Sequence, residues 1–249
     1  MIITKDEELK ILKENAKVHK IVFDNIKANL LPWINARDID KLAWDICKEH
    51  DVLCWFKWVY DFPANLCMSV NDVAVHWLPS KKIVFKEWDV VTIDFWVKDK
   101  KIWINTDAAF TVIIWEGPHD PEIERFLRVN QEALMKWIAK AVVWNRVWDI
   151  WHAIQTHIES NWFHVVKDLT WHWLWYELHE KPYIYNYWKP WTWPILKANQ
   201  LLAIEPIMWF SSWKISDRWW WEIYIADWSL WSQFEHTIIV KEWYPEIII

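Results

Sequence analysis

The stretch "DVVTIDFWVKDKKIWINTDAAFTVII", residues 89–114, predicts two β-strands joined by a polar turn. Apolar and β-branched residues dominate both flanks, and "KDKK" at 98–101 separates them as a hairpin connection does. Each strand carries a carboxylate inside its apolar run, Asp94 in "VTIDF" and Asp107 in "NTDAAF". Carboxylates are almost never fully buried unless they are paired or bound to a metal. The stretch therefore predicts an antiparallel sheet with a polar site on it.

Three further polar residues lie in strand-like contexts: His172 in "TWHWL", Glu205 in "AIEPI" and Glu235 in "QFEHTI". One carboxylate in a strand usually lies on the solvated face and means little. Four carboxylates and one imidazole together match the hard oxygen and nitrogen ligands that suit a pair of divalent ions. Such a dinuclear site can activate a water molecule and stabilise the tetrahedral intermediate of amide hydrolysis.

Helical patterns flank the strands on both sides. Apolar residues recur at helical spacing from Leu9 to Leu30, and Thr4 with Glu7 predicts a capping box before them. A second helix is predicted over 36–50, opened by Asp38 or Asn35, and two more over 120–142, with Pro121 in the first turn, and 147–163. Residues 65–77 and the chain from about 164 onward are rich in strand formers. This order predicts one α+β domain, residues 1–249, with two similar halves that each pack helices on an antiparallel sheet.

The composition excludes several classes of protein. With 54% hydrophobic and 25% charged residues the chain is globular, and its net charge of −6 without a basic stripe argues against a nucleic-acid partner. The N-terminus lacks a signal-peptide pattern, and no apolar run of about 18 residues predicts a membrane span. Three cysteines, Cys47, Cys54 and Cys67, lack CxxC spacing and favour a reducing cytoplasm.

Tryptophan and glycine occur in unusual numbers. The chain has 28 Trp and a single Gly, Gly117, whereas glycine normally makes up roughly 7% of residues. Tryptophan stands in turn contexts such as "LPWIN", "ESNWFHV" and "WKPWTWPI", flanked by Pro, Asn and Lys. Turns need glycine for positive φ angles, and a bulky indole has no local role there.

The set Asp94, Asp107, His172, Glu205 and Glu235 closely resembles the type I methionine aminopeptidase family, and the similarity spans essentially the whole chain. "SVNDVAVHWLP" (69–79) resembles the family's strand with an active-site histidine, here His76. "TWHWLWYELHEKP" (170–182) resembles its Gly-His-Gly stretch and a second histidine, here His179. Asp107 follows Asp94 at a separation of 13 positions, slightly more than the family pattern, which indicates an extended hairpin. The resemblance implies the pita-bread fold, with two pseudo-symmetric halves and helices packed on a central curved antiparallel sheet.

The resemblance also implies roles for individual residues. Two divalent ions, cobalt, manganese, iron or zinc, would be held by the five ligands Asp94, Asp107, His172, Glu205 and Glu235. Glu205 would also carry protons, His179 would stabilise the oxyanion, and His76 would contact the scissile amide nitrogen. A methionine side chain would be bound by Phe62, Cys67, Leu178 and Trp221, together with His76 and His179. Leu178 stands where the family has an aromatic residue, and Phe62, Cys67 and Leu178 would be ordinary core residues in most proteins.

The implied activity is removal of the initiator methionine from nascent polypeptides, with preference for a small second residue. The implied setting is a cytoplasmic monomer that meets nascent chains at the ribosome and binds neither nucleic acid by itself nor a membrane. One alternative is a proline-specific aminopeptidase or dipeptidase of the same fold, although those enzymes usually carry an additional N-terminal domain. Another is a metal-free pita-bread binding module, although such modules lose ligands and all five positions are intact here.

Many tryptophans stand where the resembled family has glycine: Trp33, Trp77, Trp88, Trp96, Trp162, Trp171, Trp173, Trp175, Trp193 and Trp228. Trp221 is an exception, since the family has an aromatic residue there. A non-glycine residue in the left-handed region costs roughly 1–2 kcal/mol, and overpacking costs about 1–3. Ten such sites would cost on the order of 10–30 kcal/mol, against a total stability of roughly 5–15. We therefore hypothesise that these codons are UGA, read as glycine in the source organism and written as tryptophan in this sequence.

Overall fold

The structure is a computed structural model, and it describes the polypeptide in ten segments. These are residues 2–59, 61–73, 77–115, 117–165, 170–174, 180–185, 194–211, 215–217, 223–225 and 227–249, with main chain only for 170–173, 180–185, 215–217 and 223–225. Within these residues, no helix has both the length and the apolar character required to cross a membrane.

Two helices form the N-terminal part, α1 (Asp6–Asn29) and α2 (Ala36–Glu49). The predicted pairing of Thr4 with Glu7 is wrong by one position, because it is Glu8 that accepts hydrogen bonds from the Thr4 and Lys5 amides, at 3.1 and 3.2 Å. At α2, Asn35 is the N-cap and its side chain accepts a hydrogen bond from the Arg37 amide at 2.9 Å. This resolves the choice between Asn35 and Asp38 in favour of Asn35.

A second helix pair lies in the C-terminal half, α3 (Pro121–Ile138) and α4 (Val147–Ser160). Pro121 is the first residue of α3, where its missing N–H is not needed. Asp120 caps the helix by accepting a hydrogen bond from the Glu122 amide at 2.8 Å. The four predicted helices are therefore present, with both pairs joined by short connections.

The strands form antiparallel sheets in each half. In the first half, β3 (Val90–Lys98) lies between β2 (Cys67–Val70) and β1 (Leu53–Cys54) and also pairs with β4 (Asn105–Ile113), and a short 3-10 helix covers Phe56–Trp58. In the second half, five strands follow the order β14 (Glu246–Ile247), β13 (His236–Ile239), β8 (Leu201–Ile204), β6 (Thr170–Trp173), β7 (Glu180–Tyr185). The remaining strands are β5 (His164–Val165), β9 (Ile207–Trp209) and β12 (Trp231–Gln233) in one sheet, and β10 (Ile215–Asp217) with β11 (Ile223–Ile225) in another.

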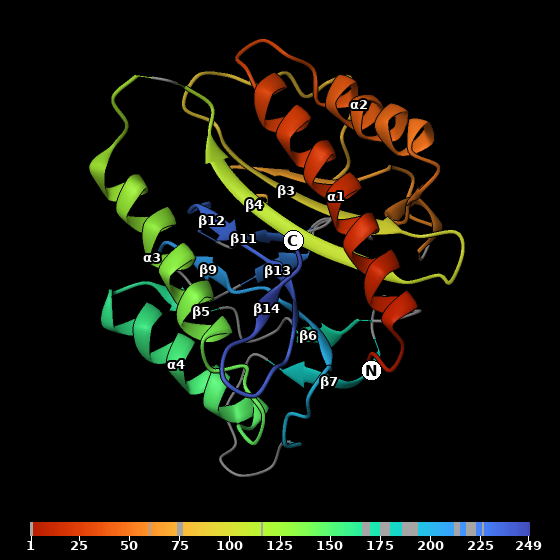
Figure 1. Cartoon of the computed structure of the whole chain (residues 1–249). Coiled ribbons are helices and arrows are strands. Elements are labelled where there is room, and N and C mark those ends of the chain that lie inside the picture. The colour runs from red at the N-terminus through yellow and green to blue at the C-terminus, as the bar shows by residue number, and fades with distance from the viewer. Residues whose placement is uncertain are drawn as a thin grey trace.

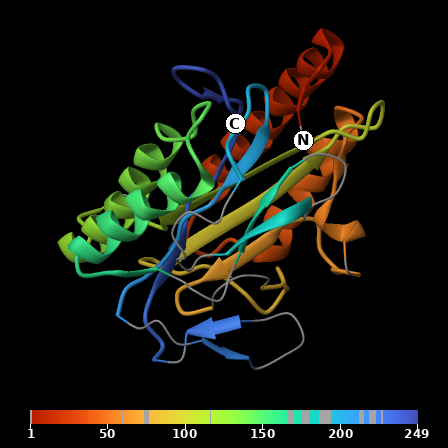
Figure 2. The same cartoon turned by 90° about the horizontal axis from the view of Figure 1, so that it is seen from below.

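The helices lie on one side of the strands. Helix α1 packs on β3 and β4, α3 on β8 and β12, and α4 on β5 (Figure 1). Figure 2 shows the helices together on one side of the strands, with the β10–β11 ribbon projecting on the other. The two halves meet where β4 passes the chain before β13, at an isolated antiparallel bridge between Ala109 and Glu235. This arrangement is the predicted α+β pita-bread architecture.

One buried apolar cluster spans both halves. It runs from Val22 in α1 to Val240 after β13, and its members include Phe95, Phe110 and Phe126. Burial of apolar surface against both sheet halves supplies the main driving force for bringing the halves together. The same cluster explains why the amphipathic helices adopt these positions, since each buries one apolar face against the strands.

Six described tryptophans adopt left-handed main-chain conformations, with φ between 62° and 76°: Trp33, Trp88, Trp103, Trp144, Trp162 and Trp228. Four of these were predicted glycine positions, and Trp103 and Trp144 add two that sequence reasoning missed. All six are exposed, up to 86% for Trp162. Trp77 and Trp96, also predicted as glycine positions, do not have positive φ. The six angles are those that glycine adopts without strain.

Candidate metal centre

The β3–β4 hairpin directs Asp94 and Asp107 to the side away from the helices. Phe95 and Phe110 face α1, because their rings contact Phe23 at centroid distances of 6.4 and 4.8 Å. Successive side chains of a strand point to opposite faces, so Asp94 faces away from α1, and so does Asp107, three positions before Phe110. Asp94 pairs with Ala109 across the hairpin, which sets the two carboxylates close together on one surface.

The second half contributes two more carboxylates. Glu205 directly follows β8, and Glu235 lies between β12 and β13 and pairs with Ala109 of β4. Carboxylate oxygens of Asp94, Asp107 and Glu235 lie within 4.8 Å of one another. Asp107, Glu205 and Glu235 are buried, and Asp94 is partly buried. Residues that are 141 positions apart in the sequence thus converge at the junction of the two halves.

Burial and mutual repulsion raise the pKa values of these carboxyls. Burial raises the pKa of Asp94 to about 7, although a hydrogen bond from Gln233 opposes the shift. Burial, followed by the charges of Asp94 and Glu205, raises the pKa of Asp107 well above its ordinary value. The pKa values of Glu205 and Glu235 are raised in the same way, first by burial and then by the neighbouring carboxylates. Four adjacent acids of this kind require either protons or cations.

The side-chain amide of Gln233 joins the two carboxylates that come from different halves. Its Nε2 donates to Glu205 Oε2 at 3.0 Å and approaches Asp94 Oδ2 at 3.5 Å. Gln233 is 1% exposed, so this contact is made away from solvent. Sequence reasoning missed Gln233. The available signal was its place two residues before Glu235 in the same strand-like segment, which puts both side chains on one face.

The donor set fits divalent cations. Asp94 Oδ1 and Glu235 Oε1 are buried, and neither accepts a hydrogen bond from the part of the chain that the structure describes. Buried carboxylate oxygens of this kind are normally paired or metal-bound. Three carboxylates have oxygens within 4.8 Å of one another, and a fourth is connected to one of them through Gln233, so the site offers the hard oxygen ligands that divalent cations prefer.

For the predicted histidine ligand, His172, the structure describes the main chain only. His172 lies in β6, where the pairing with β7 shifts register between Trp171 and Trp173. Trp173 also pairs with Leu202 of β8, the strand that ends next to Glu205. A β-bulge redirects the side chains around it and is common beside active sites. The predicted residues His76, Leu178, His179 and Trp221 lie outside the described residues.

Phe62 and Cys67 lie together on the same side as the carboxylates. Cys67 pairs with Asp94 across β2 and β3. Phe62 and Cys67 belong to a small apolar cluster with Phe56, Ala64 and Trp96. Phe62 is 4% exposed, Cys67 2% and Trp96 0%. The Trp96 indole lies opposite Asp107 in the hairpin, and its Nε1 is buried without a hydrogen-bond partner among the described residues. Trp96 therefore fills the space beside the two predicted pocket residues.

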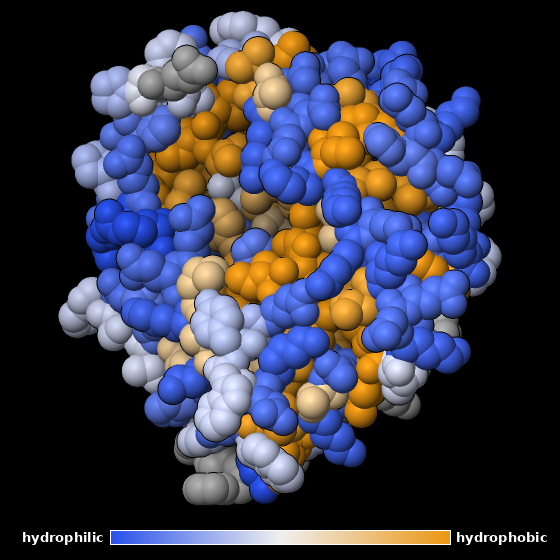
Figure 3. Space-filling model, in the orientation of Figure 1, coloured by the Kyte–Doolittle hydropathy of each residue, from blue (hydrophilic) through white to orange (hydrophobic). Residues whose placement is uncertain are grey.

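A separate cavity of about 460 Å³ lies on the helical side of the sheet, between α1 and α3. Phe23, Phe110, Leu134 and Phe234 contribute apolar lining, with Lys20 and Lys27 on one wall. Figure 3 shows apolar surface in this region bordered by polar residues. Asp94 and Asp107 point to the other side of the sheet, whereas Glu235 is also among the residues that line this cavity.

Comparison with known proteins agrees with this geometry. The chain matches the metallopeptidase family M24 over residues 10–242. A methionine aminopeptidase from Clostridium perfringens is 33% identical over 252 residues, which cover 100% of this chain and 98% of the relative.

Solved structures give the same result. The structure of a methionine aminopeptidase from Thermotoga maritima matches with a TM-score of 0.93 and 33% identity, covering 100% of this chain and 99% of that one. A prolidase from Pyrococcus furiosus, at 16% identity and a TM-score of 0.69, covers 99% of this chain and 65% of that one, and shares only the fold. The chain therefore belongs to metallopeptidase family M24, and within it to the methionine aminopeptidases.

Proposed function

We propose that the chain removes the N-terminal methionine from polypeptides by hydrolysing the first peptide bond, with preference for a small second residue. The observation that carries the proposal is the convergence of Asp94, Asp107 and Glu235 within 4.8 Å at the junction of the two halves. Full-length similarity to methionine aminopeptidases supports this choice over a proline-specific peptidase, whose matching structure resembles the chain in fold alone.

We propose Asp94, Asp107, His172, Glu205 and Glu235 as the ligands of two divalent ions, with cobalt, manganese, iron and zinc all compatible with this donor set. When bound, the ions supply Lewis acidity and activate water for attack on the amide carbonyl. Glu205 carries the proton from the attacking water to the leaving amine. Gln233 holds Glu205 through the hydrogen bond to Oε2, which keeps one carboxylate oxygen in a fixed orientation. His179 stabilises the oxyanion and His76 contacts the scissile amide nitrogen.

The methionine side chain is proposed to occupy the space beside Phe62 and Cys67, with Leu178 and Trp221 as further lining residues. In the sequence as written, Trp96 fills this space completely, since it is 0% exposed and packs in the same cluster. Glycine at position 96 would open a slot the size of an indole next to Asp94 and Asp107. The proposal therefore requires glycine at 96 for substrate binding.

The biological setting is proposed from the net charge and the cysteines. The net charge of −6 argues against nucleic acid as a direct partner. Cys47, Cys54 and Cys67 are buried and are not joined to one another by a disulfide, which supports a reducing cytoplasm. We propose a monomer that meets emerging N-termini at the ribosome, and sedimentation with and without ribosomes carrying nascent chains tests this.

The decisive experiment compares two forms of the full-length chain. One carries tryptophan as in the sequence, and the other, here called the glycine form, carries Trp96→Gly, Trp171→Gly, Trp173→Gly and Trp175→Gly. Each is freed of metal, supplied with cobalt, manganese, iron or zinc in turn, and mixed with Met-Ala-Ser, Met-Leu-Ser or Ala-Pro-Ser. Release of methionine from Met-Ala-Ser by the glycine form is expected, with little from Met-Leu-Ser. Cleavage of Ala-Pro-Ser alone would favour the proline-specific alternative, and failure to bind any metal would favour the binding module.

Two variants distinguish loss of the proposed methionine slot from a general loss of fold stability. Restoring tryptophan at 96 in the glycine form is expected to abolish methionine release while leaving metal binding in place, because the indole occupies the slot and holds no metal. Trp137→Gly is the control, since Trp137 is also 0% exposed but lies in α3 on the helical side. It should lower stability without creating a binding site. Equal methionine release with tryptophan or glycine at 96 would contradict the proposed slot.

A further inference from the structure

The two halves of the sheet meet where residues 107–111 of β4 lie beside residues 233–237, a contact here called the seam. At its centre, the Glu235 amide donates to the Ala109 carbonyl at 2.9 Å, and the Ala109 amide donates to the Glu235 carbonyl at 3.4 Å. This pair is an isolated bridge and does not continue as a regular ladder in either direction. Two residues away on each side, threonine hydroxyls make the connection.

On one side of the bridge, the Thr237 hydroxyl is hydrogen-bonded to both main-chain groups of Asp107, an arrangement here called a clasp. The Asp107 amide donates to Thr237 Oγ1 at 2.8 Å, and the same hydroxyl donates to the Asp107 carbonyl at 2.7 Å. A hydroxyl has one proton and two acceptor lone pairs, so it can serve both main-chain groups of one residue at once. Thr237 is 0% exposed and Asp107 3%.

On the other side, the Thr111 hydroxyl forms the second clasp, with both main-chain groups of Gln233. Thr111 Oγ1 donates to the Gln233 carbonyl at 2.8 Å and accepts from the Gln233 amide at 3.1 Å. Thr92 Oγ1 lies 2.9 Å from the same oxygen, and it must be the donor there because the Thr111 proton is already used. The two clasps are reciprocal. Thr237 of the second half bonds to the main chain of the first half, and Thr111 of the first half bonds to the main chain of the second.

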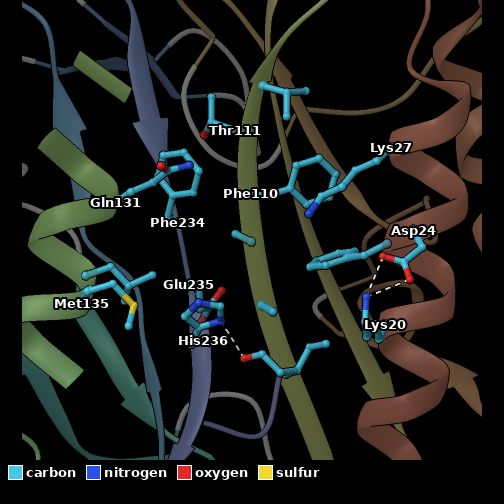
Figure 4. Close-up of a pocket in the computed structure, with 16 residues that line it drawn as sticks. Lys20, Asp24, Lys27, Phe110, Thr111, Gln131, Met135, Phe234, Glu235 and His236 are labelled. Atoms are coloured by element: carbon cyan, nitrogen blue, oxygen red, sulfur yellow. Dashed lines mark hydrogen bonds and ion pairs between the residues drawn. The ribbon is translucent and has the colours of Figure 1, made fainter. Parts of the chain in front are cut away.

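Both clasps act on the main chain that carries the carboxylates. Thr237 fixes Asp107 itself, Glu235 lies midway between the clasps, and Gln233 in turn donates to Glu205 at 3.0 Å. Figure 4 shows Thr111 on one strand and Phe234, Glu235 and His236 on the neighbouring one, beneath the cavity on the helical side. The cavity of about 460 Å³ is lined by residues from both sides of the seam, among them Ala109, Thr111 and Glu235.

We propose that Thr111 and Thr237 are positioning residues that set the distance between the metal-binding carboxylates of the two halves. A metal site needs its ligands held within about 0.5 Å of the productive geometry. Among the described residues where β4 meets 233–237, direct main-chain pairing covers only Ala109 and Glu235, so the hydroxyls are what keep Asp107 and Gln233 in register with it. Loss of an outer-shell partner typically lowers metal affinity 10–100-fold.

The inference rests on the proposed metal centre, and its test uses the glycine form. Metal-free protein is titrated with Co²⁺ by calorimetry, and the visible absorption of bound Co²⁺ reports the ligand geometry. Thr237→Val, which keeps the shape and removes the hydroxyl, is expected to weaken Co²⁺ binding about 10–100-fold and to alter the spectrum. Thr237→Ser should restore affinity to within about threefold, and Thr111→Val should weaken binding less, because it acts through Gln233.

The matched control is Thr106→Val. Thr106 precedes Asp107 in β4 and is 0% exposed, but its hydroxyl contacts Asn15 and His19 of α1 at 3.2 and 3.1 Å on the opposite face. It should lower stability and leave Co²⁺ affinity within about twofold. If Thr237→Val binds Co²⁺ as tightly as the parent, or if Thr106→Val weakens binding equally, the inference is wrong.

A second measurement does not depend on metal. Hydrogen exchange of the Asp107 and Gln233 amides in metal-free protein should accelerate at least tenfold in Thr237→Val and Thr111→Val respectively, and remain unchanged in Thr106→Val. If the parent binds no Co²⁺, the proposed metal centre fails, and the exchange rates still decide whether the clasps exist. Unchanged exchange rates of the Asp107 and Gln233 amides in both valine variants would show that the clasps do not exist.

Discussion

Trp162 provides the sharpest test of whether tryptophan belongs at the left-handed positions. It follows the C-cap Asn161 of α4, has φ of 66° and is 86% exposed. Glycine is the residue most often found at this place, because it has no Cβ to clash with the following carbonyl. Since the indole is almost entirely in solvent, Trp162→Gly removes strain and little packing.

The expected gain follows from two opposing contributions. Relief of left-handed strain is worth roughly 1–2 kcal/mol, and the greater freedom of glycine in the unfolded chain costs about 0.4–1 kcal/mol. Trp162→Gly should therefore raise the free energy of unfolding by about 0.5–1 kcal/mol. For a chain of this size each kcal/mol raises the melting temperature by roughly 2–4 °C. The matched control is Trp243→Gly. Trp243 is 89% exposed and does not have positive φ, so glycine there should lower stability.

Urea unfolding of both variants beside the parent measures the two free energies. Opposite signs are expected from the same chemical change, and shifts of equal size in the same direction would refute the strain interpretation. The coding DNA at positions 33, 88, 103, 144, 162 and 228 gives an independent check. UGA codons support glycine in the natural protein, whereas UGG codons would contradict the decoding hypothesis.

Three further predictions concern the buried acids. Because the folded-state pKa values of the four carboxyls at the metal centre are raised, the metal-free folded chain binds extra protons, and its stability should fall as pH rises from about 4 through 7 and above. Chemical unfolding at pH 5 and pH 8 checks the sign, and saturating Mn²⁺ should remove most of the fall. Glu235→Gln should raise the stability of the metal-free protein at pH 8 yet weaken Mn²⁺ binding at least tenfold; unchanged affinity by calorimetry would exclude Glu235 as a ligand. Asp40 is 1% exposed and accepts a hydrogen bond from the Asn65 amide at 2.7 Å. Asp40→Ala should therefore lower the free energy of unfolding, measured in urea, by about 2–4 kcal/mol. The control Asp45→Ala, at an exposed position, should lower it by less than about 0.5 kcal/mol.

The helices and the clustered carboxylates could be predicted because their signals are local. Pro121 and Asp120 define the start of α3 by their own chemistry, and Asn35 caps α2 through a neighbouring amide. Asp94 and Asp107 stand out because an acid inside an apolar strand is costly without a partner. The off-by-one error at Glu8 has a local cause too, since adjacent acids Glu7 and Glu8 compete for the same role and only the helix start selects between them.

Other features depend on contacts between distant parts of the chain. Gln233, Thr111 and Thr237 are ordinary polar residues by sequence, and their importance appears only where β4 meets the chain around Glu235. The left-handed conformations of Trp103 and Trp144 were likewise missed, because φ at a turn is set by the strands and helices that the turn connects.

The sequence by itself determined which residues are candidate metal ligands and which segments are helical or extended, because side-chain chemistry and periodicity are properties of the chain alone. Only the tertiary structure decided that Asp94, Asp107 and Glu235 converge within 4.8 Å, since a shared apolar core brings the two halves together. It also decided that the Trp96 indole lies against Phe62 and Cys67, where the substrate slot is proposed. Distances across the seam follow from the register of strands more than 120 residues apart, and no local pattern in the sequence specifies that register.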